Sequence, residues 1–227
     1  MRVELISYSK PSIDLVDHGI TTMEELVAFC ARVSNPSNQL STETSERLIR
    51  YLIAHKHWSP LEMVSVCLEI ETTRDIARQM LRHRSFSFQE FSQRYADPVK
   101  ELNFVIREAR MQDHKNRQNS TPVTNDNEDL VWEWQKKQEE VIECAKTAYE
   151  WAVANGIAKE QARCVLPEGN TVSRLYMNGT LRSWVHYLEL RSGNGTQKEH
   201  IDVAVACAKV ISELFPIVSV PPESGSV

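Results

Sequence analysis

The chain lacks the cysteine pattern of a disulfide-stapled or zinc-binding protein. It has five cysteines, an odd number, and no two of them form a C-x-x-C pair. Disulfide frameworks use even numbers of cysteines, and single scattered cysteines are typical of reducing compartments. We therefore expect a cytoplasmic protein, or one in the host cytoplasm if a virus encodes it. The cysteines are Cys30, Cys67, Cys144, Cys164 and Cys207.

Long apolar runs and excess positive charge are also missing. No apolar stretch approaches the roughly 20 residues that a membrane-spanning helix needs, and residues 1–6 alternate like a strand rather than a signal peptide. The formal net charge is −5, whereas nucleic-acid affinity comes largely from a basic surface that neutralises phosphates. We expect neither a membrane partner nor a general nucleic-acid partner.

Motifs for metals and dinucleotides are scarce. No G-x-G-x-x-G follows a predicted strand, which argues against a Rossmann-type site. His55 and His57 could form a metal pair, but no H-E-x-x-H or third ligand accompanies them. The acidic run 139–143 lacks the downstream carboxylates of a magnesium site, so we interpret it as a solvated helix face. No metal is expected.

The apolar pattern predicts one α+β domain over residues 1–227. With 41% hydrophobic residues, a chain of this length can bury one substantial core. We expect a small, mainly antiparallel sheet packed with several helices. Alternation predicts strands, and helical spacing with caps predicts helices. The predicted strands are 2–8 and 63–72, and the predicted helices begin at Thr22, Ser45, about Thr73, Leu130 and Lys159.

Two segments have weak structural signals. Residues 107–129 are rich in Asn, Gln and Asp, so we expect a long surface loop within the domain rather than a linker. Residues 221–227 contain two prolines, a glycine and two serines, so a frayed tail is expected there.

A basic helix is predicted over residues 74–84. Arg74, Arg78 and Arg82 repeat at i, i+4 and i+8, opposite an apolar face. Like charges at this spacing cost a helix about 0.2–0.5 kcal/mol per pair, and Asp75 is the only acid in the segment. A phosphate would complete the charge balance because guanidinium groups match its oxygens. The alternative is a basic face that pairs with acids elsewhere in the fold.

The next segment, 85–95, predicts an extended chain that binds a nucleotide. Glu90, Ser92 and Arg94 share one side of such a chain. Glu90 could then accept from a sugar hydroxyl while Ser92 and Arg94 bind an anion. A ligand with both a phosphate and a sugar hydroxyl fits this row.

These residues also form a longer motif. Arg82-His83-Arg84, seven further residues and Ser92 resemble the R-H-R-x7-S motif of flavin-dependent thymidylate synthases, including the upstream Gln79 and the internal Glu90. Other stretches agree in order, so the resemblance covers most of the chain. These stretches are 31–34, 57–62, 162–167 and 181–191.

The resemblance implies reductive methylation of dUMP to dTMP, with methylenetetrahydrofolate as carbon donor and NADPH-reduced FAD as hydride carrier. It also implies a homotetramer with shared active sites. The residues implied for dUMP are Gln79, Arg82, Glu90, Phe91, Ser92, Gln93, Arg94, Arg163 and Arg191. The residues implied for FAD are Ser59, Arg82, His83, Arg84, Glu90, Thr180, Leu181, Arg182 and His186.

Arg191 matches the arginine that polarises uracil in that family, and the implied mechanism uses no enzyme nucleophile. C5 of uracil becomes nucleophilic as negative charge develops on the ring, and a fixed guanidinium stabilises that charge. Helical spacing puts Leu181, Trp184, Val185 and Leu188 on an apolar stripe. The same spacing places Arg182, His186 and Glu189 together on the opposite side.

Three positions depart from the family pattern. Met63 replaces a frequent histidine, Thr180 replaces a frequent asparagine, and Gly193 to Gly195 replace a segment that often carries a flavin-contacting histidine. FAD contacts at these positions are therefore open.

Two alternatives to this chemistry remain. A cysteine nucleophile would need an adjacent base or cation, and only Cys164, beside Arg163, comes near. We expect a small buried thiol at Cys164. The second alternative is a nucleotide- or RNA-binding module, against which Arg163, Arg182 and Arg191 argue.

Overall fold

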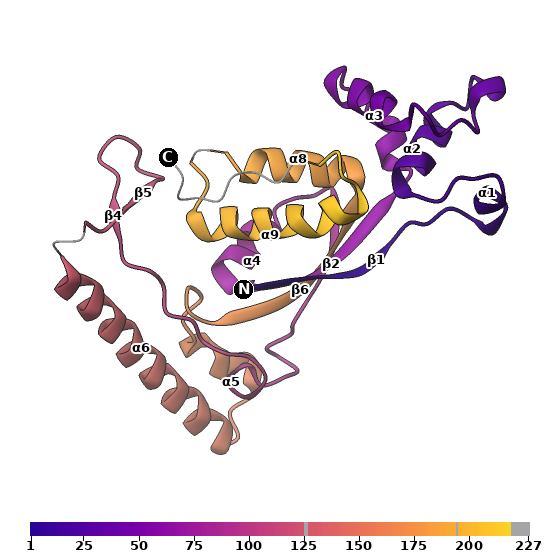
Figure 1. Cartoon of the computed structure of the whole chain (residues 1–227). Coiled ribbons are helices and arrows are strands. Elements are labelled where there is room, and N and C mark those ends of the chain that lie inside the picture. The colour runs from indigo at the N-terminus through magenta and orange to yellow at the C-terminus, as the bar shows by residue number, and fades with distance from the viewer. Residues whose placement is uncertain (125–126, 194, 219–227) are drawn as a thin grey trace.

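The computed structural model describes residues 1–124, 127–193 and 195–218 (Figure 1). Its main sheet has four strands in the order β1-β2-β6-β3, and each neighbouring pair is antiparallel. A separate two-stranded sheet pairs β4 with β5. The predicted α+β class with a small antiparallel sheet is confirmed. The strands are β1 (Arg2–Tyr8), β2 (Ser65–Thr73), β3 (Phe86–Glu90), β4 (Arg110–Gln112), β5 (Ser120–Pro122) and β6 (Val172–Thr180).

Helices α8 and α9 lie side by side over one face of the main sheet (Figure 1). Helix α6 lies apart from them, beside the segment that carries β4 and β5 (Figure 1). The helices are α1 (Ile13–Asp17), α2 (Met23–Ala31), α3 (Ser45–Ala54), α4 (Arg74–Met80), α5 (Pro98–Glu101), α6 (Glu128–Ala154), α7 (Lys159–Ala162), α8 (Leu181–Arg191) and α9 (Lys198–Leu214). Short 3₁₀ turns span Pro36–Asn38, Ser59–Glu62 and Arg163–Val165. Within the described residues, no helix is both long and apolar enough to cross a membrane.

Local signals set several helix ends. The predicted capping box forms at α2, where Thr22 accepts from the backbone N–H of Glu25 and the Glu25 carboxylate accepts from Thr22. Gly156 follows α6 with φ +80°, the left-handed conformation that glycine adopts without strain. At α3 the N-cap is Thr44 rather than Ser45, and Thr44 makes no side-chain capping bond.

Two predictions for residues 74–95 need correction. The basic helix ends at Met80, because the chain turns at Leu81 to Ser85 to enter β3, so Arg82 lies outside it. The extended chain ends at Glu90, and the backbone N–H groups of Tyr95 and Ala96 both bond to Ser92 O in a turn. Glu90, Ser92 and Arg94 therefore do not share one strand face.

The segment 107–129 was predicted as a long loop. It contains the β4–β5 hairpin, in which Arg110 pairs with Pro122, and α6 already begins at Glu128. Arg110 also bonds to Ser120 through its side chain at 2.7 Å. Polar composition concealed this hairpin because its cross-strand bonds are made by polar groups. The predicted frayed tail, 221–227, lies outside the described residues.

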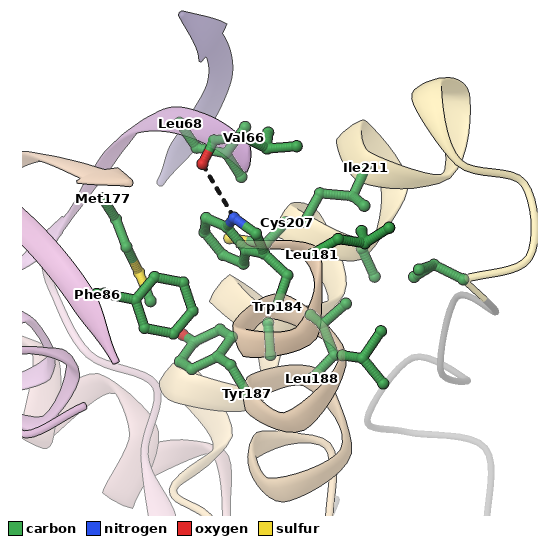
Figure 2. Close-up of a cluster of buried hydrophobic side chains, with 14 of the residues drawn as sticks. Val66, Leu68, Phe86, Met177, Leu181, Trp184, Tyr187, Leu188, Cys207 and Ile211 are labelled. Atoms are coloured by element: carbon green, nitrogen blue, oxygen red, sulfur yellow. Dashed lines mark hydrogen bonds between the residues drawn. The ribbon is translucent and has the colours of Figure 1, made fainter. Parts of the chain in front are cut away.

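Trp184 of α8 is the centre of the core between the sheet and α8. Its side chain is fully buried, and its indole Nε1 donates to Val66 O of β2 at 3.0 Å (Figure 2). Without this bond the buried indole N–H would have no hydrogen-bond acceptor. The Phe86 ring of β3 meets Trp184 edge-on, with ring centroids 4.8 Å apart. This contact fixes α8 over β2, β6 and β3.

Gly179 of β6 makes room for the Phe86 ring. The two residues are cross-strand partners, and a Cβ at Gly179 would lie 2.4 Å from Phe86 Cδ1 and 2.6 Å from Cε1. Since Phe86 is packed against Trp184, the ring cannot move aside without disturbing the core.

We predict that Gly179→Ala lowers the free energy of unfolding by about 1–3 kcal/mol, the usual cost of overpacking a core. The measurement is urea unfolding followed by circular dichroism. Gly169→Ala is the matched control, because a Cβ there meets nothing within 4 Å. Equal stability of the two variants would show that the Phe86 ring can yield.

Candidate active site

The carboxylate of Glu90 binds two arginines of α4 and a serine of β6. Glu90 ends β3, and its Oε2 lies 3.1 Å from Arg78 Nη1. Its Oε1 accepts from Ser173 Oγ at 2.9 Å and lies 3.8 Å from Arg74 Nη1. Arg74 and Arg78 face β3 because they lie one turn apart on α4, which directly follows β2.

Acidic residues of the protein itself thus balance part of the positive charge of the basic helix. Arg74 and Arg78 pair with Glu90, and Arg74 also lies 3.9 Å from Glu168. For these two arginines, the alternative of pairing with acids elsewhere in the fold is correct. Burial first, and the neighbouring Arg78 second, lowers the pKa of Arg74. Arg82 is exposed and, within the described residues, its side chain has neither a hydrogen bond nor an ion pair.

A second cluster surrounds Arg191, in the last turn of α8. Arg191 Nε donates to His83 Nε2 at 2.9 Å, so His83 is neutral and carries its proton on Nδ1. Burial, together with the charge of Arg191, lowers the pKa of His83 to about 4. Among the described residues Arg191 has no acidic partner, so its terminal N–H groups remain available to a ligand.

Gln79 joins this cluster from the end of α4. Its Oε1 lies 3.2 Å from His200 Nδ1, and its Nε2 donates to Gln197 Oε1 at 2.9 Å. The His200 side chain is fully buried. Burial, then the charges of Arg191 and His83, lowers its pKa to about 3. The predicted residues Gln79, His83 and Arg191 are therefore brought together.

Two residues of this cluster, His200 and Gln197, were not predicted from the sequence. Gln197 is the N-cap of α9 and His200 lies in its first turn, where the Tyr187 hydroxyl is 3.1 Å from His200 Nε2. A histidine on the apolar face of α9, one turn before Val203 and Ala204, was the available signal. The segment before α9 offered no motif to connect it with Gln79, which lies 121 positions away from His200.

The residues that the resemblance assigns to FAD lie mainly at the other end of α8. Thr180 is the N-cap of α8 and accepts from Ser183 N. Arg182 forms an ion pair with Glu62, and the His186 ring meets Trp58 with centroids 4.4 Å apart. Ser59 begins the neighbouring 3₁₀ turn. The two predicted faces of α8 are confirmed. The apolar residues Leu181, Trp184, Val185 and Leu188 are buried, whereas Arg182, His186 and Glu189 are not.

Leu181 and Arg84 differ in what they can offer a ligand. Leu181 is fully buried, so a ligand could reach only its backbone. Arg84 is exposed and, among the described residues, has no side-chain partner. Nine helical rises separate Arg182 from Arg191, about 13 Å along α8. An elongated ligand can therefore contact both ends of this helix.

The remaining predicted residues lie around the turn after β3. Phe91 is half-buried, and its N–H bonds to Arg174 O, while Ser92 is exposed. Arg94 pairs with Glu160 at 3.2 Å on the surface. Arg163 follows α7, close enough for its charge to lower the pKa of Arg74.

Gln93 supplies the clearest sign of a missing polar partner. Its side chain is 3% exposed, yet Nε2 has no hydrogen-bond acceptor. A buried unpaired donor costs about 1–3 kcal/mol. An anionic or carbonyl-bearing ligand beside Arg94 and Arg163 would satisfy it, so the residues present fit a phosphorylated ligand.

Three of the five cysteines are poor candidates for an activated nucleophile. Burial raises the pKa of Cys30, Cys67 and Cys207 above the ordinary thiol value. Cys164 is exposed, so the expectation of a buried thiol was wrong. Cys164 lies in the 3₁₀ turn Arg163–Val165, none of whose residues is buried.

We predict that stability falls as the pH is lowered from about 7 to about 5. The ordinary pKa of histidine is 6.5, and the folded-state values of His83 and His200 are about 4 and about 3. In that window the unfolded chain binds protons that the folded chain does not, which favours unfolding. The stabilisation is complete above 6.5 and is lost as pH falls towards the folded values.

Urea midpoints at the two pH values measure the effect. His200→Asn should show a smaller loss than the parent protein, because one titrating group is removed. The carboxylates are common to both proteins and serve as the internal control. An unchanged pH slope in His200→Asn would contradict the neutral buried histidine.

Comparison with known proteins gives a consistent result. Residues 14–217 match the family model described as thymidylate synthase complementing protein. A probable flavin-dependent thymidylate synthase of Paramecium bursaria Chlorella virus 1 is 48% identical over 96% of this chain and 97% of its own. The flavin-dependent thymidylate synthase of a Synechocystis strain is 47% identical over 96% and 98%.

A solved structure shares the fold. A UMP/dUMP methylase from Streptomyces cacaoi, bound with 5-bromo-dUMP, superposes with a TM-score of 0.77 at 27% identity. The match covers 96% of this chain and 92% of that one. Sequence and structure therefore agree that the chain belongs to the flavin-dependent thymidylate synthase family.

Proposed function

We propose that the chain is an FAD-dependent thymidylate synthase that converts dUMP to dTMP, with methylenetetrahydrofolate as carbon donor and NADPH as reductant. The observation that carries the proposal is Arg191. Its guanidinium is fixed by neutral His83 beside Gln79 and has no acid partner among the described residues. Membership of the family supports the same chemistry.

Arg191 would activate the pyrimidine. As C5 of uracil forms its bond to carbon, negative charge grows on the ring nitrogen or carbonyl oxygens. A pre-oriented guanidinium stabilises that charge more in the transition state than in the ground state. His83 contributes by accepting from Nε, which leaves the terminal N–H groups pointing elsewhere. The raised pKa values of Cys30, Cys67 and Cys207 argue against these three thiols as nucleophiles.

The phosphate of dUMP would bind around the turn after β3. Ser92, Arg94 and Arg163 supply a hydroxyl and two guanidinium groups there, and Gln93 Nε2 is the unsatisfied donor. Binding would require Arg94 to exchange its surface pair with Glu160, a contact of low cost between exposed groups. The nucleotide would extend from there towards Gln79 and Arg191. Completing the proposed set are Arg82, Glu90 and Phe91.

FAD would lie along α8 and the turn before β3. When bound, the flavin carries the hydride equivalents taken from NADPH. The exposed cations Arg82 and Arg84 would bind its phosphates, and Thr180, Arg182 and His186 would contact it at the N-terminal half of α8. Arg182 would reach the flavin while it remains paired with Glu62. Ser59, His83, Glu90 and the Leu181 backbone complete the proposed set.

The reaction is tested by tritium release from dUMP labelled at C5, with FAD, NADPH and methylenetetrahydrofolate present and each omitted in turn. We expect release that requires all three. Arg191→Ala should lose release by at least about 100-fold, the scale of removing a transition-state donor, while dUMP still binds measurably. Arg191→Lys keeps the positive charge but lacks the planar, paired N–H donors of the guanidinium group, so it should recover only part of the rate.

Absence of release by folded, flavin-loaded protein that still binds dUMP would contradict the synthase and favour a nucleotide-binding module. NADPH oxidation without dUMP is the control for an intact flavin site. In Arg191→Ala this oxidation should be unchanged within about twofold, because Arg191 is assigned to the pyrimidine.

We also propose a homotetramer. The support is a set of large apolar side chains on α6, Trp132, Trp134, Val141 and Trp151, that the described residues leave exposed. Exposed tryptophans of this size mark interaction surfaces. The free cysteines fit assembly in the cytoplasm.

Light scattering should give a mass four times the chain mass of 26.1 kDa. Replacing Trp132 and Trp134 with Gln should shift the mass downwards and weaken flavin retention, since shared sites would be broken. Glu140→Gln, an exposed change on the same helix, should leave the mass unaltered. A monomer that retains flavin and activity would contradict the proposal.

A further inference from the structure

One directed chain of hydrogen bonds passes through Gln79. It begins at Tyr187, whose side chain lies in the core beside Phe86 (Figure 2). The Tyr187 hydroxyl is 3.1 Å from His200 Nε2, and His200 Nδ1 is 3.2 Å from Gln79 Oε1. Gln79 Nε2 then donates to Gln197 Oε1 at 2.9 Å. Gln79 is therefore held from both sides by buried or half-buried groups.

The chemistry of the partners decides the direction of each bond. An amide oxygen can only accept, so His200 Nδ1 must carry the proton that it donates to Gln79 Oε1. His200 Nε2 then accepts from the Tyr187 hydroxyl, whose pKa burial raises, so it keeps its proton. Burial and the cation of Arg191 also keep His200 neutral. This tautomer is the one that satisfies both neighbours.

The other side of Gln79 is fixed by charge. Gln197 Nε2 donates to Glu199 Oε2 at 2.9 Å, and Glu199 lies 3.0 Å from Arg107 Nη1. Arg107 also contacts Asp75 of α4 at 2.6 Å. These ionic ends leave Gln197 Oε1, rather than its amine, to face Gln79. If the Gln79 amide were rotated by half a turn, its Oε1 would face Gln197 Oε1 and its Nε2 would face the N–H of His200 Nδ1. Neither contact could form a hydrogen bond.

We propose that His200 is a positioning residue for nucleotide binding: it holds the Gln79 amide so that its second Nε2–H faces the ligand. This inference rests on the proposed function, in which Gln79 contacts dUMP. Gln79 would then offer one donor, whose partner must be an acceptor such as a hydroxyl, carbonyl or phosphate oxygen of the nucleotide. His200 itself does not touch the ligand.

The test compares His200→Leu with His200→Asn. Leucine removes the donor to Gln79 Oε1, whereas asparagine places an amide nitrogen near the position of Nδ1. Calorimetric titration with dUMP should show affinity roughly threefold to tenfold weaker in His200→Leu, the scale of one lost oriented hydrogen bond. His200→Asn should recover most of it. Tyr187→Phe, which frees the His200 tautomer, should weaken binding less than His200→Leu.

A purely structural role for His200 is separated by two further measurements. Ile211→Val, a fully buried change further along α9, provides a destabilised control that should bind dUMP normally. NADPH oxidation without dUMP should stay within about twofold in all variants, while the KM for dUMP rises in His200→Leu. Equal dUMP affinity of the parent and His200→Leu would overturn the positioning role. An equal loss in Ile211→Val would also overturn it.

Failure of the proposed function gives a different result. If the parent protein binds no dUMP under conditions where it holds flavin, the assignment of Gln79 to dUMP fails before any variant is compared. If the parent binds dUMP and the two His200 variants are alike, only the positioning role fails.

Discussion

The contact between Arg191 and His83 joins the last turn of α8 to the turn that follows α4. It is a hydrogen bond from a permanent cation to a neutral acceptor, so it orients the guanidinium without neutralising it. Burial and the adjacent charge hold the pKa of His83 near 4. A carboxylate in the same place would pair with Arg191 and weaken its attraction for negative charge on a ligand.

The rest of the structure keeps this contact in place. Trp184 fixes α8 over the sheet through its bond to Val66 O, and the Phe86 ring fits against Trp184 because Gly179 has no side chain. His83 precedes Phe86 by three residues, so the position of β3 sets the position of the histidine. The core contacts of Trp184 and Phe86 therefore hold both partners of the Arg191–His83 hydrogen bond in place, because they fix α8 and β3.

The charged groups divide into those that build the site and those left for ligands. Glu90 pairs with Arg74 and Arg78, and Arg107 joins Asp75 to Glu199. Within the described residues, Arg82, Arg84 and Arg191 have no acidic partner. A chain of net charge −5 thus keeps a local excess of positive charge beside Gln79. That excess attracts anionic ligands, a nucleotide among them.

The sequence by itself determined the α+β class, the strand 2–8, the capping box at Thr22 and the two faces of α8, because these depend on neighbouring residues and on helical or strand periodicity. The motif around Arg82 also identified the family. Only the tertiary structure decided that Arg74 and Arg78 pair with Glu90, that the chain turns at Ser92, and that His200 reaches Gln79. These contacts depend on β6 lying between β2 and β3, and on α9 returning over the sheet. No local pattern encodes the partners that such long-range packing brings together.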